Sequence, residues 1–207
     1  MKSEDLDGVY GAKNPDEART LYDDWSGSYD ADNLAKGFRL PALGAGLLAS
    51  YIGRTKGPIL DAGCGTGLVG ETLMVMGYMH VFGCDISKEM MALADKTGAY
   101  SGFEQADMGT KLPYADDHFA GFVCVGSFGP GHAPASTLTH LARVTRPGGY
   151  GVFNLLEHSY VDQGFPPVME KLAADGVWEV AHVTPPFLPF LLGEPDLWSR
   201  AYVVKML

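Results

Sequence analysis

Short apolar runs alternate with helix-like segments from residue 58 to the end of the sequence. Seven runs are predicted to be strands, at 59–62, 80–85, 102–106, 119–125, 150–156, 177–184 and 198–206. The run at 119–125 is apolar throughout, which is typical of a strand buried on both faces of a parallel sheet. Helices are predicted between the runs, at 68–76, 87–96, 134–144 and 168–174. Repeated strand–helix units with short connections predict an α/β fold, with a mostly parallel seven-stranded sheet and helices on both faces.

The first 56 residues have a different pattern. Residues 1–13 are polar and are expected to form a flexible leader. Asn14-Pro15-Asp16-Glu17 is a typical helix start, with a capping residue, a proline at the first helical position and acids in the first turn. Helical spacing then relates Ala18, Leu21, Tyr22, Trp25 and Tyr29, and residues 34–52 continue in helical style with a break near Pro41. The sequence therefore predicts one domain, with a helical cover at 14–56 ahead of a core at 57–207.

The charge balance narrows the range of partners. The 207 residues carry a formal net charge of −10, and the basic residues form no stripe, so a polyanion such as nucleic acid would be repelled. No apolar signal segment and no stretch long enough to span a bilayer is present, so a cytoplasmic protein with no membrane anchor is expected. Cys64, Cys84 and Cys124 lack metal-binding spacing and are expected to be buried free thiols, with no metal site.

The most informative stretch joins the first predicted strand to the helix that follows it. Strand 59–62 contains Asp61, and Gly63-Cys64-Gly65-Thr66-Gly67 comes next. Glycines permit a sharp turn and let a ligand approach backbone N–H groups, and the helix N-terminus adds partial positive charge. In mostly parallel sheets, ligands bind beyond the carboxyl ends of the strands, where the strand order reverses. A small-molecule cofactor site is therefore predicted around this turn, Asp85, Asp107 and Gly126.

Two cofactors compete for the predicted site. Gly65-Thr66-Gly67-Leu68-Val69-Gly70 fits the dinucleotide fingerprint, and Asp85 supplies an acid about 20 residues later, so an NAD-dependent oxidoreductase is one hypothesis. Three features count against it. Asp61 precedes the glycines, where it would repel a pyrophosphate, and the first glycine directly follows the strand. A second acid, Asp107, ends the third strand, where it is placed to accept a hydrogen bond from an exocyclic amine.

Taken together, the motifs resemble those of the class I S-adenosylmethionine (SAM)-dependent methyltransferases, from about residue 22 to the end of the chain. The matching segments are the nucleotide-site motif at 61–67, a second motif at 83–87, a third at 105–108 and the helix-to-strand join at 141–149. Residues 22–30 resemble the aromatic opening segment of many small-molecule methyltransferases. Within the class, the nearest resemblance is to the Williams–Beuren syndrome region methyltransferase-like proteins, which indicates no particular acceptor. The resemblance implies a Rossmann-like fold, SAM as cofactor and S-adenosylhomocysteine (SAH) as product.

The resemblance also implies roles in the cofactor site. The methionine and ribose portions would lie against the turn made by Gly63, Cys64, Gly65 and Gly67. Asp85 would accept hydrogen bonds from both ribose hydroxyls, a two-point contact that suits a carboxylate. Ile86 and Met108 would enclose the adenine, with Asp107 near its amino group.

Two further groups complete the implied cofactor site. Asp61 and the carbonyl groups around Gly126 would face the methionine ammonium. Tyr22, Trp25 and Tyr29 would form a lid over the cofactor. A cationic ligand in a site rimmed with carboxylates suits a sulfonium better than a pyrophosphate.

The predicted acceptor side lies after the fourth strand. Residues 125–132 lack the Asp/Asn-Pro-Pro-aromatic motif of methyltransferases that act on nucleobase or glutamine amino groups, which counts against those acceptors. His132 is the titratable residue in this loop and is the candidate general base, with His158 as a second candidate. Phe128, Tyr160 and residues 187–192 are expected to line the acceptor pocket.

The sequence therefore predicts a SAM-dependent methyltransferase that transfers a methyl group to a small or medium-sized acceptor by in-line displacement. A small acceptor is favoured because no large acceptor domain is inserted in the chain. Two alternatives stay open: a SAM- or SAH-binding module without catalysis, acting as a sensor or regulatory subunit, and the NAD-dependent oxidoreductase.

Overall fold

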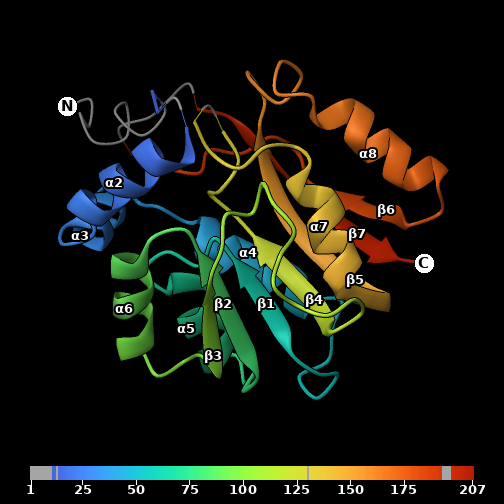
Figure 1. The fold of residues 1–207 in the computed structure, drawn as a ribbon, viewed down its shortest axis with the longest axis horizontal. Coiled ribbons are helices and arrows are strands. Elements are labelled where there is room, and N and C mark those ends of the chain that lie inside the picture. Colours follow the sequence, from blue (N-terminus) through green and yellow to red (C-terminus); the bar gives the residue numbers. More distant parts are fainter. Residues whose placement is uncertain (1–10, 13, 130, 193–196) are drawn as a thin grey trace.

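A seven-stranded sheet runs through the computed structural model, which describes residues 11–12, 14–129, 131–192 and 197–207 (Figure 1). The strands are β1 (Ile59–Ala62), β2 (Val81–Asp85), β3 (Gly102–Gln105), β4 (Phe119–Cys124), β5 (Thr145–Leu156), β6 (Trp178–Val183) and β7 (Ser199–Met206). Their order across the sheet is β3-β2-β1-β4-β5-β7-β6. β7 runs antiparallel to β5 and β6, and the other pairs are parallel. The predicted mostly parallel sheet is confirmed, and its strand order reverses between β1 and β4.

Helices cover both faces of the sheet, as predicted (Figure 1). They are α4 (Leu40–Ala49), α5 (Leu68–Val75), α6 (Lys88–Lys96), α7 (Thr137–Val144) and α8 (Phe165–Ala174). Neighbouring side chains of a strand point to opposite faces. Ile59 and Val123 therefore pack in the apolar layer with α4 and α5, whereas Leu60 and Phe122 pack in the layer with α7 and α8. In the described part of the chain, no helix is long and apolar enough to cross a bilayer.

Several predicted boundaries differ from the structure. β5 begins at Thr145 rather than at residue 150, because Thr145 pairs with Phe119 and a register shift accommodates the Pro-Gly-Gly run that follows. α7 begins at residue 137 rather than 134. α8 begins at residue 165 rather than 168, because Gly164 precedes it at a φ of +76° and Pro166 fits the first helical turn, where no N–H is needed.

The N-terminal helices lie beside α6, near the carboxyl ends of the strands (Figure 1). α2 (Pro15–Trp25) begins as predicted, with the Asn14 side chain accepting a hydrogen bond from the Glu17 N–H at 2.9 Å. It ends before Gly27, and α3 (Tyr29–Ala35) starts a new direction, so the predicted aromatic face is shared between two helices. α4 instead packs against β4 and β5, so the segment 14–56 also contributes one helix to the sheet layers. Most of the expected leader at 1–13 lies outside the described residues.

We predict opposite effects for alanine at Gly44 and Gly46, two glycines of α4. A Cβ atom on Gly44 would lie 2.9 Å from Val125 Cγ1 and 3.0 Å from Val123 Cγ1, whereas nothing lies within 4 Å of one on Gly46. Because alanine favours a helix over glycine by about 0.5–1 kcal/mol, Gly46→Ala should raise the free energy of unfolding by that amount. Gly44→Ala overpacks the helix against the sheet and should lower it by about 1–3 kcal/mol. Urea denaturation measures both changes, and equal effects would contradict the close approach of α4 to β4.

Candidate active site

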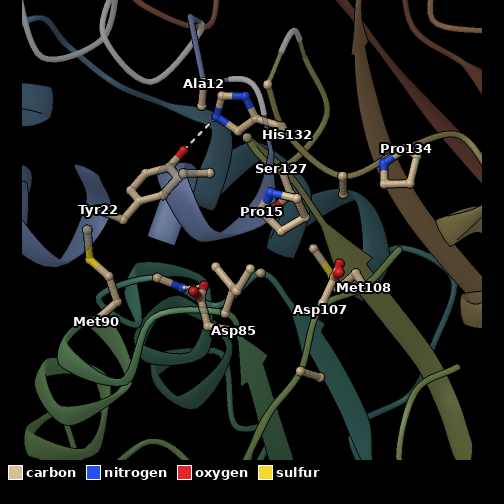
Figure 2. Close-up of a pocket in the computed structure, with 18 of the residues that line it drawn as sticks. Ala12, Pro15, Tyr22, Asp85, Met90, Asp107, Met108, Ser127, His132 and Pro134 are labelled. Atoms are coloured by element: carbon tan, nitrogen blue, oxygen red, sulfur yellow. Dashed lines mark hydrogen bonds between the residues drawn. The ribbon is translucent and has the colours of Figure 1, made fainter. Parts of the chain in front are cut away.

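A cavity of about 420 Å³ opens at the carboxyl ends of β1, β2 and β4 (Figure 2). It lies where the strand order reverses, which is the expected place for a ligand in such a sheet. Its volume is typical of a small-molecule site. The predicted site residues that line it are Tyr22, Tyr29, Gly63, Gly65, Asp85, Ile86, Asp107, Met108, Gly126 and His132. The structure therefore brings together most of the residues that the sequence selected.

The turn after β1 presents bare backbone to this cavity. The Gly63 and Cys64 N–H groups donate to the Cys84 carbonyl oxygen at 2.8 and 3.0 Å, which fastens the turn to β2. Gly63 has a φ of +73°, and a Cβ atom on it would lie 2.1 Å from Ser127 Oγ. Gly67, at a φ of +98°, forms the N-cap of α5. No side chain fits at Gly63, so a ligand can approach the main chain there.

Asp85 joins two turns with one carboxylate. Its Oδ2 accepts a hydrogen bond from the Gly65 N–H, and its Oδ1 accepts one from the Ser87 N–H, both at 2.9 Å. Burial raises the pKa of the Asp85 carboxyl, and these backbone N–H groups partly oppose the rise. Asp107 lies nearby at the end of β3, with its Oδ1 accepting from the Gly109 N–H at 2.8 Å. The floor of the cavity thus carries two carboxylates (Figure 2).

The opposite side of the cavity is formed by the N-terminal helices and the loop after β4. The Tyr22 hydroxyl lies 2.6 Å from His132 Nε2, and this hydrogen bond stands across the cavity from Asp85 and Asp107 (Figure 2). Two hydroxyl-to-carboxylate hydrogen bonds fasten the helices to the cofactor-site turns. Ser87 donates to Asp23 and Thr66 donates to Asp30, each at 2.5 Å. The N-terminal helices are therefore attached directly to the segments that follow β1 and β2.

A second, smaller cavity of about 30 Å³ lies beside the first, and both are lined by Tyr22, Tyr29, Gly126 and His132. Trp25, which was predicted to contact the cofactor, lines only this smaller cavity. So do several residues predicted for the acceptor pocket, namely Phe128 and, from 187–192, Pro189 and Phe190. Tyr160 and the exposed His158 line neither cavity.

Asp61 lies behind the glycine turn rather than in the cavity wall. Its side chain is 1% exposed, and its Oδ2 accepts a hydrogen bond from the Tyr100 hydroxyl at 2.6 Å. The Tyr100 oxygen in turn accepts from the Gly70 N–H at 3.1 Å, so Tyr100 links β1 to the first turn of α5. Burial raises the pKa of Asp61 to about 7, although the Tyr100 hydrogen bond opposes this rise. Cys64 and Gly67 also lie outside the lining of the larger cavity, although they belong to the same turn.

The three cysteines are buried free thiols, as predicted. Burial raises the pKa of the Cys84 thiol to about 12 and that of Cys124 well above its ordinary range, so both stay protonated. Among the described residues, no group of three or more His, Cys, Asp or Glu side chains is arranged to hold a metal ion.

Sequence reasoning missed part of the cavity wall. Ala12, Asn14, Pro15 and Ala18 line it, at and just before the start of α2. The capping pattern at Asn14 predicted a helix start there, but no local pattern indicates what a helix start lies against. Met90 also lines the cavity, although its helical spacing suggested only packing within α6.

Comparison with known proteins agrees with this geometry. Residues 59–149 match the methyltransferase domain family. Methyltransferase-like protein 27 of Homo sapiens is 30% identical over 176 residues, which cover 80% of this chain and 70% of that protein. The chain belongs to the SAM-dependent methyltransferases. A second methyltransferase relative, the ubiquinone/menaquinone biosynthesis C-methyltransferase UbiE of Bdellovibrio bacteriovorus, is 36% identical over 144 residues, covering 66% of this chain and 60% of that protein.

Solved methyltransferase structures share the fold. A SAM-dependent methyltransferase of Thermotoga maritima, described as a possible histamine N-methyltransferase, superimposes with a TM-score of 0.64 at 16% identity. The match covers 90% of this chain and 98% of that one. The Rossmann-like fold predicted from the resemblance is thus confirmed, and the enzyme uses SAM.

The residues in the larger cavity fit this cofactor. Gly63 leaves a bare stretch of backbone that any side chain would fill. Asp85 and Asp107 give the floor negative charge, which complements a cationic sulfonium and would oppose a pyrophosphate. The methyltransferase assignment and the geometry therefore agree, and both stand against the dinucleotide hypothesis.

We predict that Asp61 makes the stability of the enzyme depend on pH. In the unfolded chain this carboxyl has an ordinary pKa of about 4, whereas burial raises it to about 7 in the fold. The folded protein thus holds the proton more tightly, and this contribution to stability is lost as the pH rises from about 4 through 7. Asp61→Asn has no carboxyl that titrates at this position, so its stability does not fall in this way. The free energy of unfolding of Asp61→Asn minus that of wild type should therefore rise by about 2–3 kcal/mol when the pH is raised from 5 to 8.

Urea denaturation at the two pH values measures this difference. Asp95→Asn, at an exposed position on α6, is the matched control and should show the same pH dependence as wild type. An Asp61→Asn variant whose stability follows that of wild type at both pH values would show that Asp61 does not titrate in this range.

Proposed function

We propose that the protein transfers the methyl group of SAM to a small or medium-sized uncharged acceptor. The observation that carries the proposal is the Tyr22–His132 pair, which stands between the larger cavity and the smaller one. A bound acceptor beside this pair is next to both the cofactor cavity and a titratable side chain. The name of the UbiE relative, a C-methyltransferase of ubiquinone and menaquinone biosynthesis, supports a small-molecule acceptor.

The cofactor is proposed to lie across the floor of the larger cavity. Asp85 would accept from the ribose hydroxyls, since each of its oxygens has a lone pair left after accepting one backbone N–H. Asp107 would accept from the adenine amino group, with Ile86 and Met108 against the faces of the ring. The carbonyl groups around Gly126 would face the ammonium group.

Asp61 is proposed to contribute from behind the turn. Its hydrogen bond from Tyr100 and the Gly70 N–H on the Tyr100 oxygen hold the first turn of α5 in place. A negative charge under the turn would also attract the cationic end of the cofactor. Cys64 and Gly67 would contribute to cofactor binding through the backbone shape of the turn rather than through contact in the larger cavity.

Methyl transfer depends on how the acceptor is positioned and on whether it has to lose a proton. SAM supplies an activated methyl group whose transfer is an in-line displacement. The walls of the two cavities hold the acceptor in line and exclude water, which contributes several kcal/mol when the reacting atoms are held about 3 Å apart. When the acceptor loses a proton, the Tyr22 hydroxyl can relay it to His132 Nε2, which lies 2.6 Å away.

The charges of the site favour an uncharged acceptor. Among the described residues, no Lys or Arg lines either cavity, whereas Asp85 and Asp107 line the larger one. A phosphate or carboxylate group would find no cationic partner there and would be repelled by the floor. The net charge of −10 would likewise repel a nucleic acid as acceptor. A cytoplasmic location would suit such a substrate.

We predict that the purified protein binds SAH and does not bind NAD⁺ in isothermal calorimetry. Micromolar affinity for SAH corresponds to about −8 kcal/mol. Asp85→Ala should weaken binding by about 1.5–3 kcal/mol, because it removes hydrogen bonds to a charged group. Glu104→Ala, an exposed acid on β3, is the control and should bind SAH as wild type does. A folded protein that binds NAD⁺ but not SAH would overturn the cofactor assignment.

We predict that His132→Ala lowers turnover without weakening SAH binding. The readout is SAH formation with neutral phenols, hydroquinones, amines and thiols, with nucleotides and tRNA as acceptors that should fail. Loss of a general base costs roughly 10²- to 10⁴-fold in kcat, and Tyr22→Phe should share part of that loss. His158→Ala, which changes an exposed histidine outside both cavities, should leave kcat unchanged. Equal kcat values for wild type and His132→Ala would exclude His132 as the base, and SAH binding without transfer to any acceptor would favour a non-catalytic module.

A further inference from the structure

We propose that Asn154, a residue of β5, is a positioning residue for the amino-acid end of the cofactor. It acts through Gly126, by holding the loop after β4 in the conformation that turns its carbonyl groups toward the cofactor. The proposal rests on the proposed function, in which these carbonyl groups face the ammonium group. Asn154 lines the smaller cavity and not the larger one, so it lies outside the sequence motifs that point to the cofactor site.

Asn154 is a buried amide in an apolar stretch of strand. Residues 151–156 of β5 are all buried, and Asn154 is 1% exposed. The other five residues of this stretch are glycine, valine, phenylalanine or leucine. Burial of an amide costs free energy unless the amide is hydrogen-bonded. The hydrogen-bond partners of Asn154 therefore account for a polar side chain at this position.

The first partner is Gly126, which lies just beyond the end of the β4–β5 ladder. The last paired residues are Cys124 and Phe153, and Gly126 then leaves the strand at a φ of +74°. Its N–H donates to Asn154 Oδ1 at 2.8 Å. Because an N–H can only donate, the amide oxygen has to face Gly126, which fixes the way the Asn154 side chain is turned.

The second partner is Ser199, at the start of β7. Asn154 Nδ2 donates to Ser199 Oγ at 2.9 Å, and Ser199 Oγ donates to the Leu155 carbonyl oxygen at 2.9 Å. Ser199 is fully buried, and its main chain exchanges two hydrogen bonds with Phe187, at 2.8 and 2.9 Å. Each donor in this series meets an acceptor, so the amide is held from the β7 side in the orientation that Gly126 requires.

Gly126 lies where an extended cofactor would place its amino-acid end. The carboxyl ends of β3, β2, β1 and β4 follow one another across the sheet. In the proposed arrangement, the adenine lies at Asp107, after β3, and the ribose lies at Asp85, after β2. A ligand that continues in the same direction passes the glycine turn after β1 and reaches Gly126, which lines the larger cavity after β4. The hydrogen bond to Asn154 thus stabilises the backbone conformation on which the direction of the nearby carbonyl groups depends.

The test compares SAH with 5′-methylthioadenosine by calorimetry. The second ligand has the adenosine and thioether portions of SAH but lacks the amino-acid group. Asn154→Leu keeps a side chain of similar size and removes the acceptor of the Gly126 N–H. We expect this variant to bind SAH roughly 10-fold more weakly than wild type, because the contact to a charged group is lost, and to bind 5′-methylthioadenosine within about 2-fold of wild type.

Two further variants separate positioning from a loss of stability. Asn154→Asp keeps an oxygen that can face the Gly126 N–H, so it should bind SAH within about 3-fold of wild type. Thr145→Val is the matched control, because Thr145 is another buried polar residue of β5. Its Oγ1 donates to the Leu141 carbonyl oxygen at 2.8 Å, at the opposite end of the strand. Thr145→Val should be less stable to urea and should bind both ligands as wild type does.

Ser199→Ala gives a milder version of the same test, should Asn154→Leu fail to fold. It leaves Asn154 in place but removes the acceptor of its Nδ2 group. We expect a selective loss of SAH affinity of roughly 3-fold, again without an effect on 5′-methylthioadenosine.

The outcomes distinguish the proposal from the proposed function. Equal weakening of both ligands in a folded variant would show that Asn154 only supports the fold, and unchanged SAH affinity would show that Gly126 does not need this partner. Either result overturns the proposal and leaves the methyltransferase function in place. A wild-type protein that binds neither ligand would instead refute the proposed cofactor arrangement, and the role of Asn154 with it.

Discussion

Two backbone N–H groups, those of Gly65 and Ser87, donate to the two oxygens of a single carboxylate, Asp85. This carboxylate fixes the turn after β1 against the turn after β2, and each turn leads into a helix whose start depends on it. The hydroxyls of Thr66 and Ser87, in these same turns, donate to Asp30 and Asp23 of the N-terminal segment. The turns on the floor of the larger cavity and the N-terminal helices above it are therefore held together by one set of hydrogen bonds. A ligand that orders these turns also orders the N-terminal helices.

The buried carboxyls of Asp61 and Asp85 affect which ligands the site favours. Burial raises the pKa values of both Asp61 and Asp85. Repulsion from Asp85 raises the pKa of Asp61 further, and repulsion from Asp23 raises that of Asp85. A cationic ligand relieves this repulsion, whereas an anionic one adds to it. In the proposed arrangement, the substrate form of the cofactor carries one positive charge more than its product. In this arrangement, the carboxylates thus favour the binding of SAM over the binding of SAH, the product that has to be released.

The sequence predicted the sheet and the floor of the site because both depend on local pattern. Strands and helices follow from apolar periodicity, and the glycine turn, Asp85 and Asp107 occupy fixed positions at strand ends. The cover was harder to predict. The spacing of Tyr22, Trp25 and Tyr29 suggested one helical face, but the chain breaks near Gly27, so Tyr29 belongs to α3 whereas Tyr22 and Trp25 belong to α2. Tyr22 and Tyr29 line both cavities, and Trp25 lines only the smaller one. Tyr100 gave no signal, since its partners Asp61 and Gly70 are 39 and 30 residues away in sequence.

The acceptor side was the least predictable for a related reason. Its walls include residues of α2 and α3, the segment after α3, the loop after β4, the end of β5 and the segment before β7, which meet only in the folded protein. Most of these segments lie outside the parallel strands of the sheet. In the proposed arrangement, the glycine turn and the carboxylates at the strand ends hold the cofactor, whereas the peripheral segments contact the acceptor. The acceptor side therefore has to be described from the residues that line the smaller cavity in the folded protein, rather than from the motifs that identify the family.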